Sequence, residues 1–199
     1  MIDPYPPASD IGEILVTTDE LRTRVDELGT QIAADLDGRT PLLVGVLKGS
    51  VIFIADLMRA IAGPVEIDFM AVSSYGDATE SSGVVRIVKD LDGGVAGRDV
   101  ILVEDIIDSG LTMAYLVDYL SGQGPASLRT CSLLVREGRT APGVQLDYVG
   151  FELPPAFVVG YGLDAGQRYR NLPYIAIYSP SAPSGEGGSD SGGLTDGSA

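Results

Sequence analysis

Helical and strand-like patterns of apolar residues alternate along most of the chain. The clearest helical pattern covers residues 17–36, where apolar residues recur every three or four positions and Thr17 and Glu20 have the spacing of a capping box. Further helical patterns occur at 51–61 and 111–120, and apolar runs typical of buried strands occur at 41–49, 65–75, 99–105 and 127–135. This alternation predicts an α/β fold with a central, mostly parallel sheet flanked by helices.

The pattern changes in the last quarter of the chain. Short strand-like pieces at 147–151, 157–162 and 174–179 follow one another without helices, which predicts a smaller appended layer. Residues 179–199 are rich in Gly and Ser, so they cannot bury enough apolar surface to offset the entropy of ordering. We therefore expect one folded domain, residues 1–178, followed by a disordered tail, residues 179–199.

Composition and charge exclude several classes of function. The 199 residues are 45% hydrophobic, and 28 acidic against 13 basic residues give a net charge of −15, which disfavours binding to nucleic acid or to an anionic membrane. The chain has no His and a single Cys, so His-dependent triads, His metal sites and Cys zinc clusters are excluded. Cys131 lies in an apolar run and is interpreted as core. With neither a signal-peptide pattern nor a membrane span, we expect a cytoplasmic protein.

One segment, residues 100–112, combines features of a binding site. A continuous apolar run at 100–103 predicts a central parallel strand, and Glu104 and Asp105 stand where that strand is expected to end. Ligands bind at the carboxyl ends of strands in open α/β sheets. The polar loop 108–112 then begins a helix, whose free backbone amides form an anion site.

Two carboxylates beside an anion site favour a ligand that has both an anion and hydroxyl groups. A sugar phosphate meets this condition: its phosphate would bind the loop amides, while Glu104 and Asp105 accept hydrogen bonds from ribose hydroxyls, directly or through Mg²⁺. The alternative is that the acids are a solvated strand end and that Asp108 is only the N-cap of the helix. These 13 residues alone leave both interpretations open.

The segment resembles the ribose-phosphate and pyrophosphate-binding signature of the type I phosphoribosyltransferases, in particular the hypoxanthine-guanine phosphoribosyltransferase family. The resemblance extends over about residues 12–178. It includes four further stretches in the same order, namely LKGS (47–50), SSYGDATESSGVVRIVKDL (73–91), SLLVRE (132–137) and FVVGYGLD with Arg170 (157–170). It implies the type I phosphoribosyltransferase fold, with a small hood built from the N-terminal part and residues of about 150–178.

The resemblance implies transfer of ribose 5-phosphate from phosphoribosyl pyrophosphate to a 6-oxopurine, with Mg²⁺ as cofactor. Glu104 and Asp105 would hold the ribose and the metal, and Asp108 would be the catalytic acid or base at the purine nitrogen N7. The 5-phosphate would bind the loop formed by Asp108, Ser109, Gly110, Leu111 and Thr112.

The resemblance also implies a pyrophosphate subsite. Leu47, Lys48 and Gly49 match the pyrophosphate loop of the family, Arg170 would neutralise pyrophosphate, and Asp164 would help to hold the metal on that side. Lys48 is one of only two lysines, which favours a role in the site, although a surface lysine closing a strand would look the same.

On the purine side, Phe157 resembles the aromatic residue that stacks on the base, and Val158 would offer backbone groups to the edge of the base. The alternative for Phe157 is a place in the core. Arg136 stands where the family usually has a Lys that donates to the 6-oxo group. Because a guanidinium is longer, planar and permanently charged, the preference among hypoxanthine, guanine and xanthine is left open.

Ser74 and Tyr75 match the start of the mobile loop that closes over the site in the family, although an ordinary exposed hairpin would have the same composition. The resemblance further implies a homodimer or homotetramer.

Three other classes of protein are disfavoured. A nucleotide-sensing regulator that binds RNA should have a basic cluster, which this chain lacks. A receiver domain would leave loop 108–112 unexplained, and a P-loop hydrolase would need a motif that is absent here.

Overall fold

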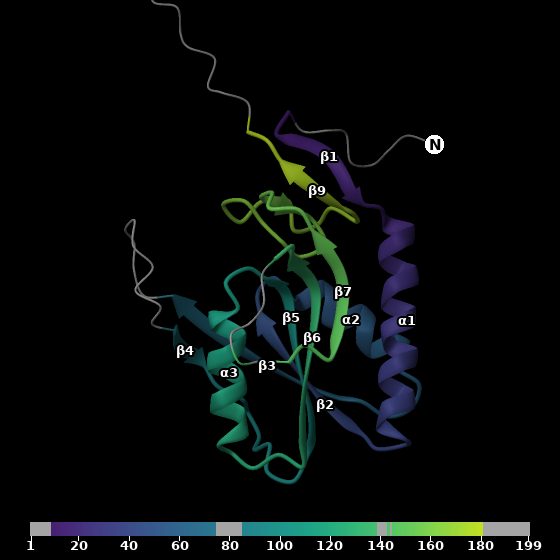
Figure 1. Cartoon of the computed structure of the whole chain (residues 1–199), viewed down its shortest axis with the longest axis vertical. Helices are drawn as coiled ribbons and strands as arrows, with labels where there is room; N and C mark the ends of the chain where they lie inside the picture. Colours follow the sequence, from purple (N-terminus) through teal and green to yellow (C-terminus); the bar gives the residue numbers. More distant parts are fainter. Residues whose placement is uncertain (1–8, 75–84, 139–142, 144, 181–199) are drawn as a thin grey trace, which may run out of the picture.

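A six-stranded sheet forms the centre of the protein. Figure 1 presents a computed structural model of the chain, which describes residues 9–74, 85–138, 143 and 145–180. In spatial order the strands are β4 (Val85–Lys89), β3 (Glu66–Ser74), β2 (Pro41–Leu47), β5 (Asp99–Ile107), β6 (Ser127–Arg136) and β7 (Tyr148–Leu153). All neighbouring pairs are parallel except β3 and β4, which are antiparallel. The predicted α/β architecture is therefore confirmed.

Helices cover both faces of this sheet. Helices α1 (Thr18–Leu36) and α2 (Val51–Ala60) lie on one face and α3 (Leu111–Ser121) lies on the other, as Figure 1 shows. Each face has its own apolar core: Ile32 and Phe53 belong to the first, and Leu102 and Leu116 to the second. Burial on both faces explains why the central strands are continuous apolar runs. Cys131 is fully buried in the first core, as predicted.

Helix α1 begins and ends where the sequence predicts. Thr17 is the N-cap, its hydroxyl accepts from the backbone N–H of Glu20, and the Glu20 carboxylate accepts in return from the Thr17 backbone N–H at 2.8 Å. The Thr17 hydroxyl also donates to the Glu20 carboxylate at 2.7 Å, and this hydrogen bond, together with that from the Thr17 backbone N–H, lowers the pKa of Glu20. At the other end Asp37 adopts a left-handed conformation before Gly38. The capping box therefore defines the start of the helix in the structure as in the sequence.

A small antiparallel sheet stands over the carboxyl ends of the main-sheet strands (Figure 1). It consists of β1 (Ile11–Val16), β9 (Ile175–Tyr178) and β8 (Val158–Val159), in that order. A separate apolar cluster, which includes Val159, Ala165 and Leu172, supports it. We call residues 157–178 together with β1 the hood. It faces the edge of the main sheet at which the candidate site residues gather.

Two sequence predictions about strands are wrong. Residues 147–151 were expected in the appended layer, but they belong to β7, which pairs in parallel with β6 at the edge of the main sheet. The reason is burial: Tyr148 is only 1% exposed and packs in the same core as α1. The strand predicted at 99–105 continues to Ile107, because its pairing with β6 extends to Val135. Glu104 and Asp105 therefore lie within β5 and not after it.

The tail predicted at 179–199 lies outside the described residues, apart from positions 179 and 180. Within the described part of the chain, no helix is both long and apolar enough to cross a lipid bilayer.

Candidate active site

The junction of β5 and α3 forms a short polar loop. Gly110 is the N-cap of α3 and has φ +74°, a left-handed conformation that favours glycine. Because Gly110 holds the N-cap position, the interpretation of Asp108 as the N-cap is wrong. Among the described residues the Leu111 N–H donates to Ser109 Oγ at 3.4 Å, whereas no hydrogen bond engages the N–H groups of Thr112 and Met113. A cavity of about 90 Å³ lined by Glu104, Asp108, Ser109, Gly110 and Thr112 among others opens here, where these N–H groups can bind an anion.

The two acids of β5 point to different sides of the strand, as successive strand residues do. Glu104 is buried and lines the cavity of the polar loop. Burial, with a further contribution from the neighbouring Asp105 charge, raises the pKa of Glu104 to about 8. Burial also raises the pKa of Asp105, opposed by backbone N–H groups and by the positive charge of Arg170. Both carboxyl groups therefore hold their protons to higher pH than they would in water, and a bound cation would favour their ionised forms.

Loop 47–49 lies directly against the second of these acids. The Leu47–Lys48 peptide bond is cis. A Cβ atom on Gly49 would stand 1.7 Å from Asp105 Oδ2, so only glycine fits between the loop and the carboxylate. The Lys48 side chain is exposed, and no hydrogen bond or ion pair holds it among the described residues. Lys48 is thus a positive charge at the edge of the acid pair that remains available to a ligand.

Asp164 and Arg170 form an ion pair in the hood. Arg170 Nη2 lies 2.6 Å from Asp164 Oδ1, and Arg170 Nη1 donates to the Gly162 carbonyl at 2.7 Å. Asp164 also accepts from the Gln167 backbone N–H at 2.7 Å. The charges of this pair act on Asp105, as the opposing effects of Arg170 and Asp164 on its pKa show. The structure therefore brings these two predicted residues to the same edge as the acid pair.

Arg136 lies between the polar loop and the hood. Its Nε atom is 3.1 Å from Asp108 Oδ1, and its Nη1 atom donates to the Ala156 carbonyl. The side chain is only 17% exposed, and the Nε atom makes no aligned hydrogen bond within the described part of the chain. Arg136 is thus a largely buried guanidinium that is paired with one predicted site residue and holds the backbone next to another, Phe157.

Phe157 is 55% exposed, so the alternative that it belongs to the core is wrong. Its ring faces that of Tyr178 with centroids 5.7 Å apart and an interplanar angle of 60°, which leaves an aromatic surface open at the hood. Val158, by contrast, is buried in β8.

The predicted lid lies at the edge of the described residues. Ser74 is the last residue of β3 and pairs with Val85 of β4, whereas Tyr75 lies outside the described part of the chain. The strands on either side of residues 75–84, β3 and β4, are antiparallel partners. The lid stays a prediction.

The carboxylates of Glu104, Asp105 and Asp164 fit a hard divalent cation if a bound substrate supplies further oxygen ligands. Within the described residues, no group of three or more acidic or Cys side chains is placed to hold a metal ion. Mg²⁺ is typically bound through one or two carboxylates, with the other positions taken by water and substrate phosphates. The oxygen donors of Glu104, Asp105 and Asp164 match that preference.

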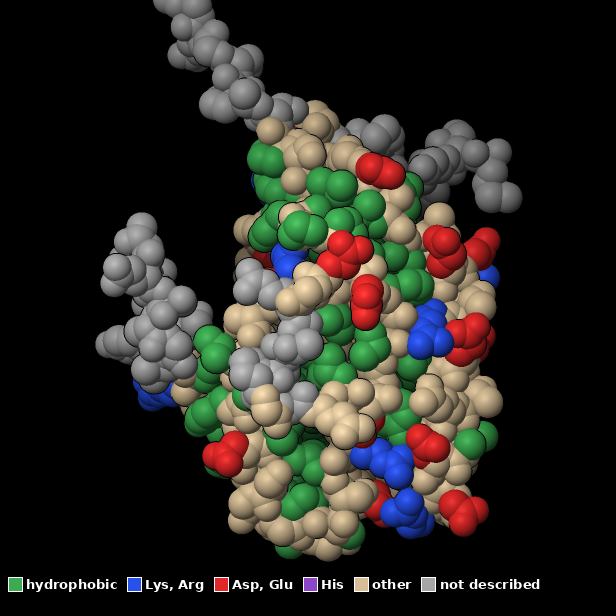
Figure 2. All heavy atoms as spheres, viewed as in Figure 1, with side chains coloured by type: hydrophobic (Ala, Val, Ile, Leu, Met, Phe, Trp, Pro, Cys, Tyr) green, Lys and Arg blue, Asp and Glu red, His purple; other side chains and the backbone are tan. Residues whose placement is uncertain are grey.

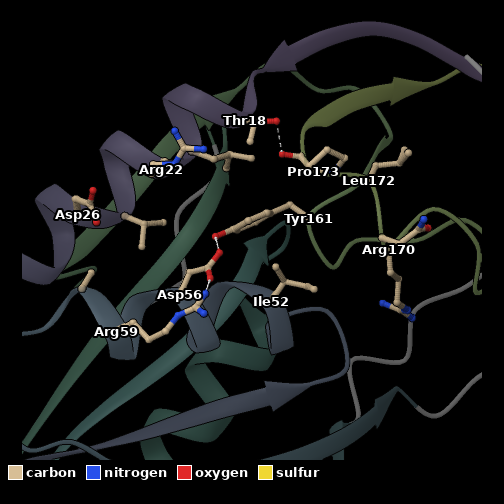
Figure 3. A pocket seen from close by; sticks show the side chains of 14 residues that line it. Thr18, Arg22, Asp26, Ile52, Asp56, Arg59, Tyr161, Arg170, Leu172 and Pro173 are labelled. Atoms are coloured by element: carbon tan, nitrogen blue, oxygen red, sulfur yellow. Dashed lines mark hydrogen bonds and ion pairs between the residues drawn. The ribbon is translucent and has the colours of Figure 1, made fainter. Parts of the chain in front are cut away.

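A cavity of about 480 Å³ lies beside this site between α1, α2 and the hood. Figure 3 shows Tyr161 reaching from the hood to Asp56 of α2 along its floor. Sequence reasoning missed both residues. Glycines on each side of Tyr161 were the available signal for an unusual backbone there, but nothing in the sequence points to Asp56.

Charge is mixed on the face of the protein that Figure 2 draws. On the face drawn in Figure 2, Lys and Arg side chains lie singly or in small groups close to Asp and Glu side chains.

Comparison with known proteins identifies relatives along most of the chain. The model of the phosphoribosyl transferase domain family matches residues 15–165. The hypoxanthine-guanine phosphoribosyltransferase of Mycobacterium tuberculosis strain H37Rv is 50% identical over 182 residues, covering 88% of this chain and 89% of the relative. The bifunctional protein TilS/HprT of Listeria innocua is 50% identical over 172 residues, and the chain spans only 26% of its length.

A solved structure agrees with these relatives. The hypoxanthine phosphoribosyltransferase of Trypanosoma cruzi, in complex with the product IMP, superposes with a TM-score of 0.80 at 41% identity, covering 88% of this chain and 98% of that one.

Proposed function

The chain belongs to the phosphoribosyl transferase domain family, and from this we propose that it is a hypoxanthine-guanine phosphoribosyltransferase of purine salvage. It transfers ribose 5-phosphate from phosphoribosyl pyrophosphate to hypoxanthine or guanine, giving IMP or GMP and pyrophosphate. Half of its residues are identical to those of the M. tuberculosis enzyme over most of both chains. The observation that carries the proposal is the β5–α3 junction, where the buried acid Glu104 and the residues at the start of α3 line one cavity.

The sugar phosphate would bind at this junction by both of its ends. The first-turn amides of α3 hold the 5-phosphate, and the positive end of the helix dipole favours its charge. Glu104 and Asp105 accept hydrogen bonds from the ribose hydroxyls. Gripping the sugar at two points fixes the position of its C1 atom, which lowers the entropic part of the barrier.

The leaving group needs positive charge. As the bond between C1 and the pyrophosphate oxygen breaks, Lys48 and Arg170 stabilise the charge that develops on pyrophosphate. Asp164 and the acids of β5, together with substrate oxygens, would hold Mg²⁺, and the bound ion would neutralise further charge on pyrophosphate. A net charge of −15 would otherwise repel this polyanionic substrate.

The purine would enter between the polar loop and the hood. Phe157 offers its exposed ring for stacking, and the backbone of Val158 faces the edge of the base. Arg136 donates to the 6-oxo group, and Asp108, paired with Arg136 at 3.1 Å, takes the proton from N7 as N9 bonds to C1. Ser74 and Tyr75 begin the segment that closes over these reactants and excludes water, the competing nucleophile.

The partners and the setting follow the same proposal. We propose small-molecule substrates, a homodimer or homotetramer, and the cytoplasm as the place of action. The mixed surface charge in Figure 2 gives no support to an RNA-binding regulator.

An ultraviolet assay tests the function. The protein, with phosphoribosyl pyrophosphate and Mg²⁺, is mixed in turn with hypoxanthine, guanine, xanthine, adenine and uracil. We expect turnover with hypoxanthine or guanine, and none with adenine or uracil. Turnover confined to adenine or uracil, or turnover with no base, would contradict the proposal.

The metal is tested in the same assay. We expect excess chelator to abolish turnover and added Mg²⁺ to restore it. Substantial turnover in the chelator would contradict the role of the metal.

A further inference from the structure

Tyr161 has an unusual position for a large residue. It lies in the hood with φ +48°, a left-handed conformation that costs a non-glycine residue free energy, and it is flanked by Gly160 and Gly162. Its side chain is almost fully buried, with 7% exposure. Figure 3 shows the ring crossing from the hood to α2, where the hydroxyl donates to Asp56 Oδ2 at 2.5 Å. This contact ties the hood to a helix of the main domain.

The next residue touches the pyrophosphate loop. Gly162 has φ +106°, and a Cβ atom there would stand 2.0 Å from the Gly49 carbonyl oxygen. On its other side Gly49 lies against Asp105. The backbone of loop 47–49 is therefore enclosed between the Asp105 carboxylate and Gly162, one residue from the Tyr161 anchor.

The Asp164–Arg170 ion pair is attached to the same backbone. The Gly162 N–H donates to the Arg170 carbonyl at 2.9 Å, and the Arg170 side chain donates to the Gly162 carbonyl at 2.7 Å. Any movement of Gly162 therefore moves Arg170 and, through the ion pair, Asp164. Gly162 is therefore in contact both with the loop that carries Lys48 and with the Asp164–Arg170 ion pair of the hood.

We propose that Tyr161, anchored by its hydrogen bond to Asp56, is a positioning residue for the pyrophosphate half of the site. The anchor holds Gly162 on loop 47–49 and so keeps Lys48, Asp164 and Arg170 in a single arrangement. This inference rests on the proposed function, since it assigns pyrophosphate to that half. Tyr161 itself touches no reactant; it acts through Gly162.

The test compares substrate constants in Tyr161→Phe, which removes only the hydroxyl. We expect KM for phosphoribosyl pyrophosphate, and KM for pyrophosphate in the reverse reaction, to rise at least tenfold. KM for the purine should change less than twofold. The proposed purine residues Arg136, Asp108 and Phe157 are held by contacts that do not involve Tyr161 or Gly162. Asp56→Ala should reproduce the effect, and the double variant should be no worse than either single variant.

The chain offers a matched control. Tyr148 is a second buried tyrosine, and its hydroxyl donates to Asp35 at 2.9 Å and accepts from Arg129 at 2.6 Å, beside α1 and away from the hood. Tyr148→Phe therefore removes a comparable Tyr–Asp bond. We expect a similar fall in melting temperature but unchanged KM values.

Asp56→Asn gives the conservative variant, because its amide oxygen still accepts from Tyr161 while its charge is gone. We expect its KM for phosphoribosyl pyrophosphate to stay within threefold of the parent value, which supports a hydrogen bond and not the Asp56–Arg59 ion pair as the anchor. Should Tyr161→Phe fail to fold, Asp56→Ala carries the test, because it removes the acceptor of the same hydrogen bond.

Two outcomes overturn the inference: KM for phosphoribosyl pyrophosphate unchanged in Tyr161→Phe, or equal rises for the purine and for phosphoribosyl pyrophosphate. Failure of the proposed function is seen separately, as absence of turnover in the parent protein. If the parent protein uses another base, the change in KM for phosphoribosyl pyrophosphate relative to the change in KM for that base still tests the role of Tyr161.

Discussion

The two halves of the candidate site are built differently. The sugar-phosphate half comes from one continuous segment, residues 104–112, in which a strand passes directly into a helix. The pyrophosphate and purine half is assembled from separate pieces, namely loop 47–49, Arg136 and the hood. It is held by contacts between them, such as Gly162 on Gly49 and Arg136 on Ala156.

Because of this difference, we expect substitutions in the two halves to affect activity in different ways. In the continuous half, backbone geometry follows from the strand–helix junction, so a substitution mainly removes the chemical group it deletes. In the assembled half, geometry depends on packing between distant segments. Residues that touch no reactant should therefore control binding there. The following predictions test the contrast, from the largest expected effect to the smallest.

Asp108→Ala should have the largest effect, because it removes the proposed base. We expect kcat to fall about 10²- to 10⁴-fold with little change in KM for phosphoribosyl pyrophosphate, measured by steady-state kinetics. Asp118→Ala, an exposed acid later on α3, is the control and should leave kcat unchanged. A fall below about threefold in Asp108→Ala would assign proton transfer to another group.

Glu104→Gln should change the pH dependence of stability in the metal-free protein. Burial raises the pKa of Glu104 from 4.5 in the unfolded chain to about 8 in the fold. The folded state therefore holds a proton that the unfolded chain releases, and stability falls as pH rises from about 4.5 to 8. Urea unfolding should detect a loss of a few kcal/mol in the parent, at about 1.4 kcal/mol per pKa unit.

In Glu104→Gln the part of this fall that is due to Glu104 should disappear, leaving the contribution of Asp105, whose pKa is also raised. Glu13→Gln, on an exposed strand, serves as the control and should keep the parent's pH dependence. An unchanged slope in Glu104→Gln would mean that Glu104 is ionised in the fold.

Gly162→Ala tests the assembled half by disturbing the contact between two backbone segments, without removing a polar side chain. The new Cβ would stand 2.0 Å from the Gly49 carbonyl, so loop 47–49 must move. We expect KM for phosphoribosyl pyrophosphate to rise about thirtyfold, equivalent to about 2 kcal/mol. Gly63→Ala is a close control, because its φ of +105° imposes the same backbone strain but nothing lies within 4 Å of the added atom. Equal KM values in the two variants would refute the contact as the cause.

Arg136→Lys should have the smallest effect. A single ammonium cannot both pair with Asp108 and donate to the Ala156 carbonyl in the planar geometry of a guanidinium. We expect kcat/KM for the purine to fall about tenfold, or about 1.4 kcal/mol, with unchanged KM for phosphoribosyl pyrophosphate. Arg98→Lys, which keeps its ion pair with Glu66, is the control. A gain in activity with lysine would show that Arg136 limits the reaction.

Much of the fold could be predicted from local pattern. Helix α1 has its capping box and apolar face in consecutive residues, and β2 and β5 are apolar runs because helices cover both faces of the sheet. The prediction for residues 147–151 failed because the sequence shows no helical pattern between them and the preceding strand, although β6 and β7 pair in parallel. Only the packing of Tyr148 against α1 places that strand in the main sheet.

The sequence by itself determined the β5–α3 half of the candidate site, for which we propose sugar-phosphate binding. Its strand, acids, glycine and helix start are neighbours in the chain, so local backbone geometry brings them together. Tertiary structure alone decided that Arg136 pairs with Asp108, that Phe157 is exposed, and that Tyr161 reaches Asp56. Tyr161 and Asp56 are 105 residues apart. Such contacts depend on how the hood packs over the sheet, which is a property of the whole core and not of any short segment.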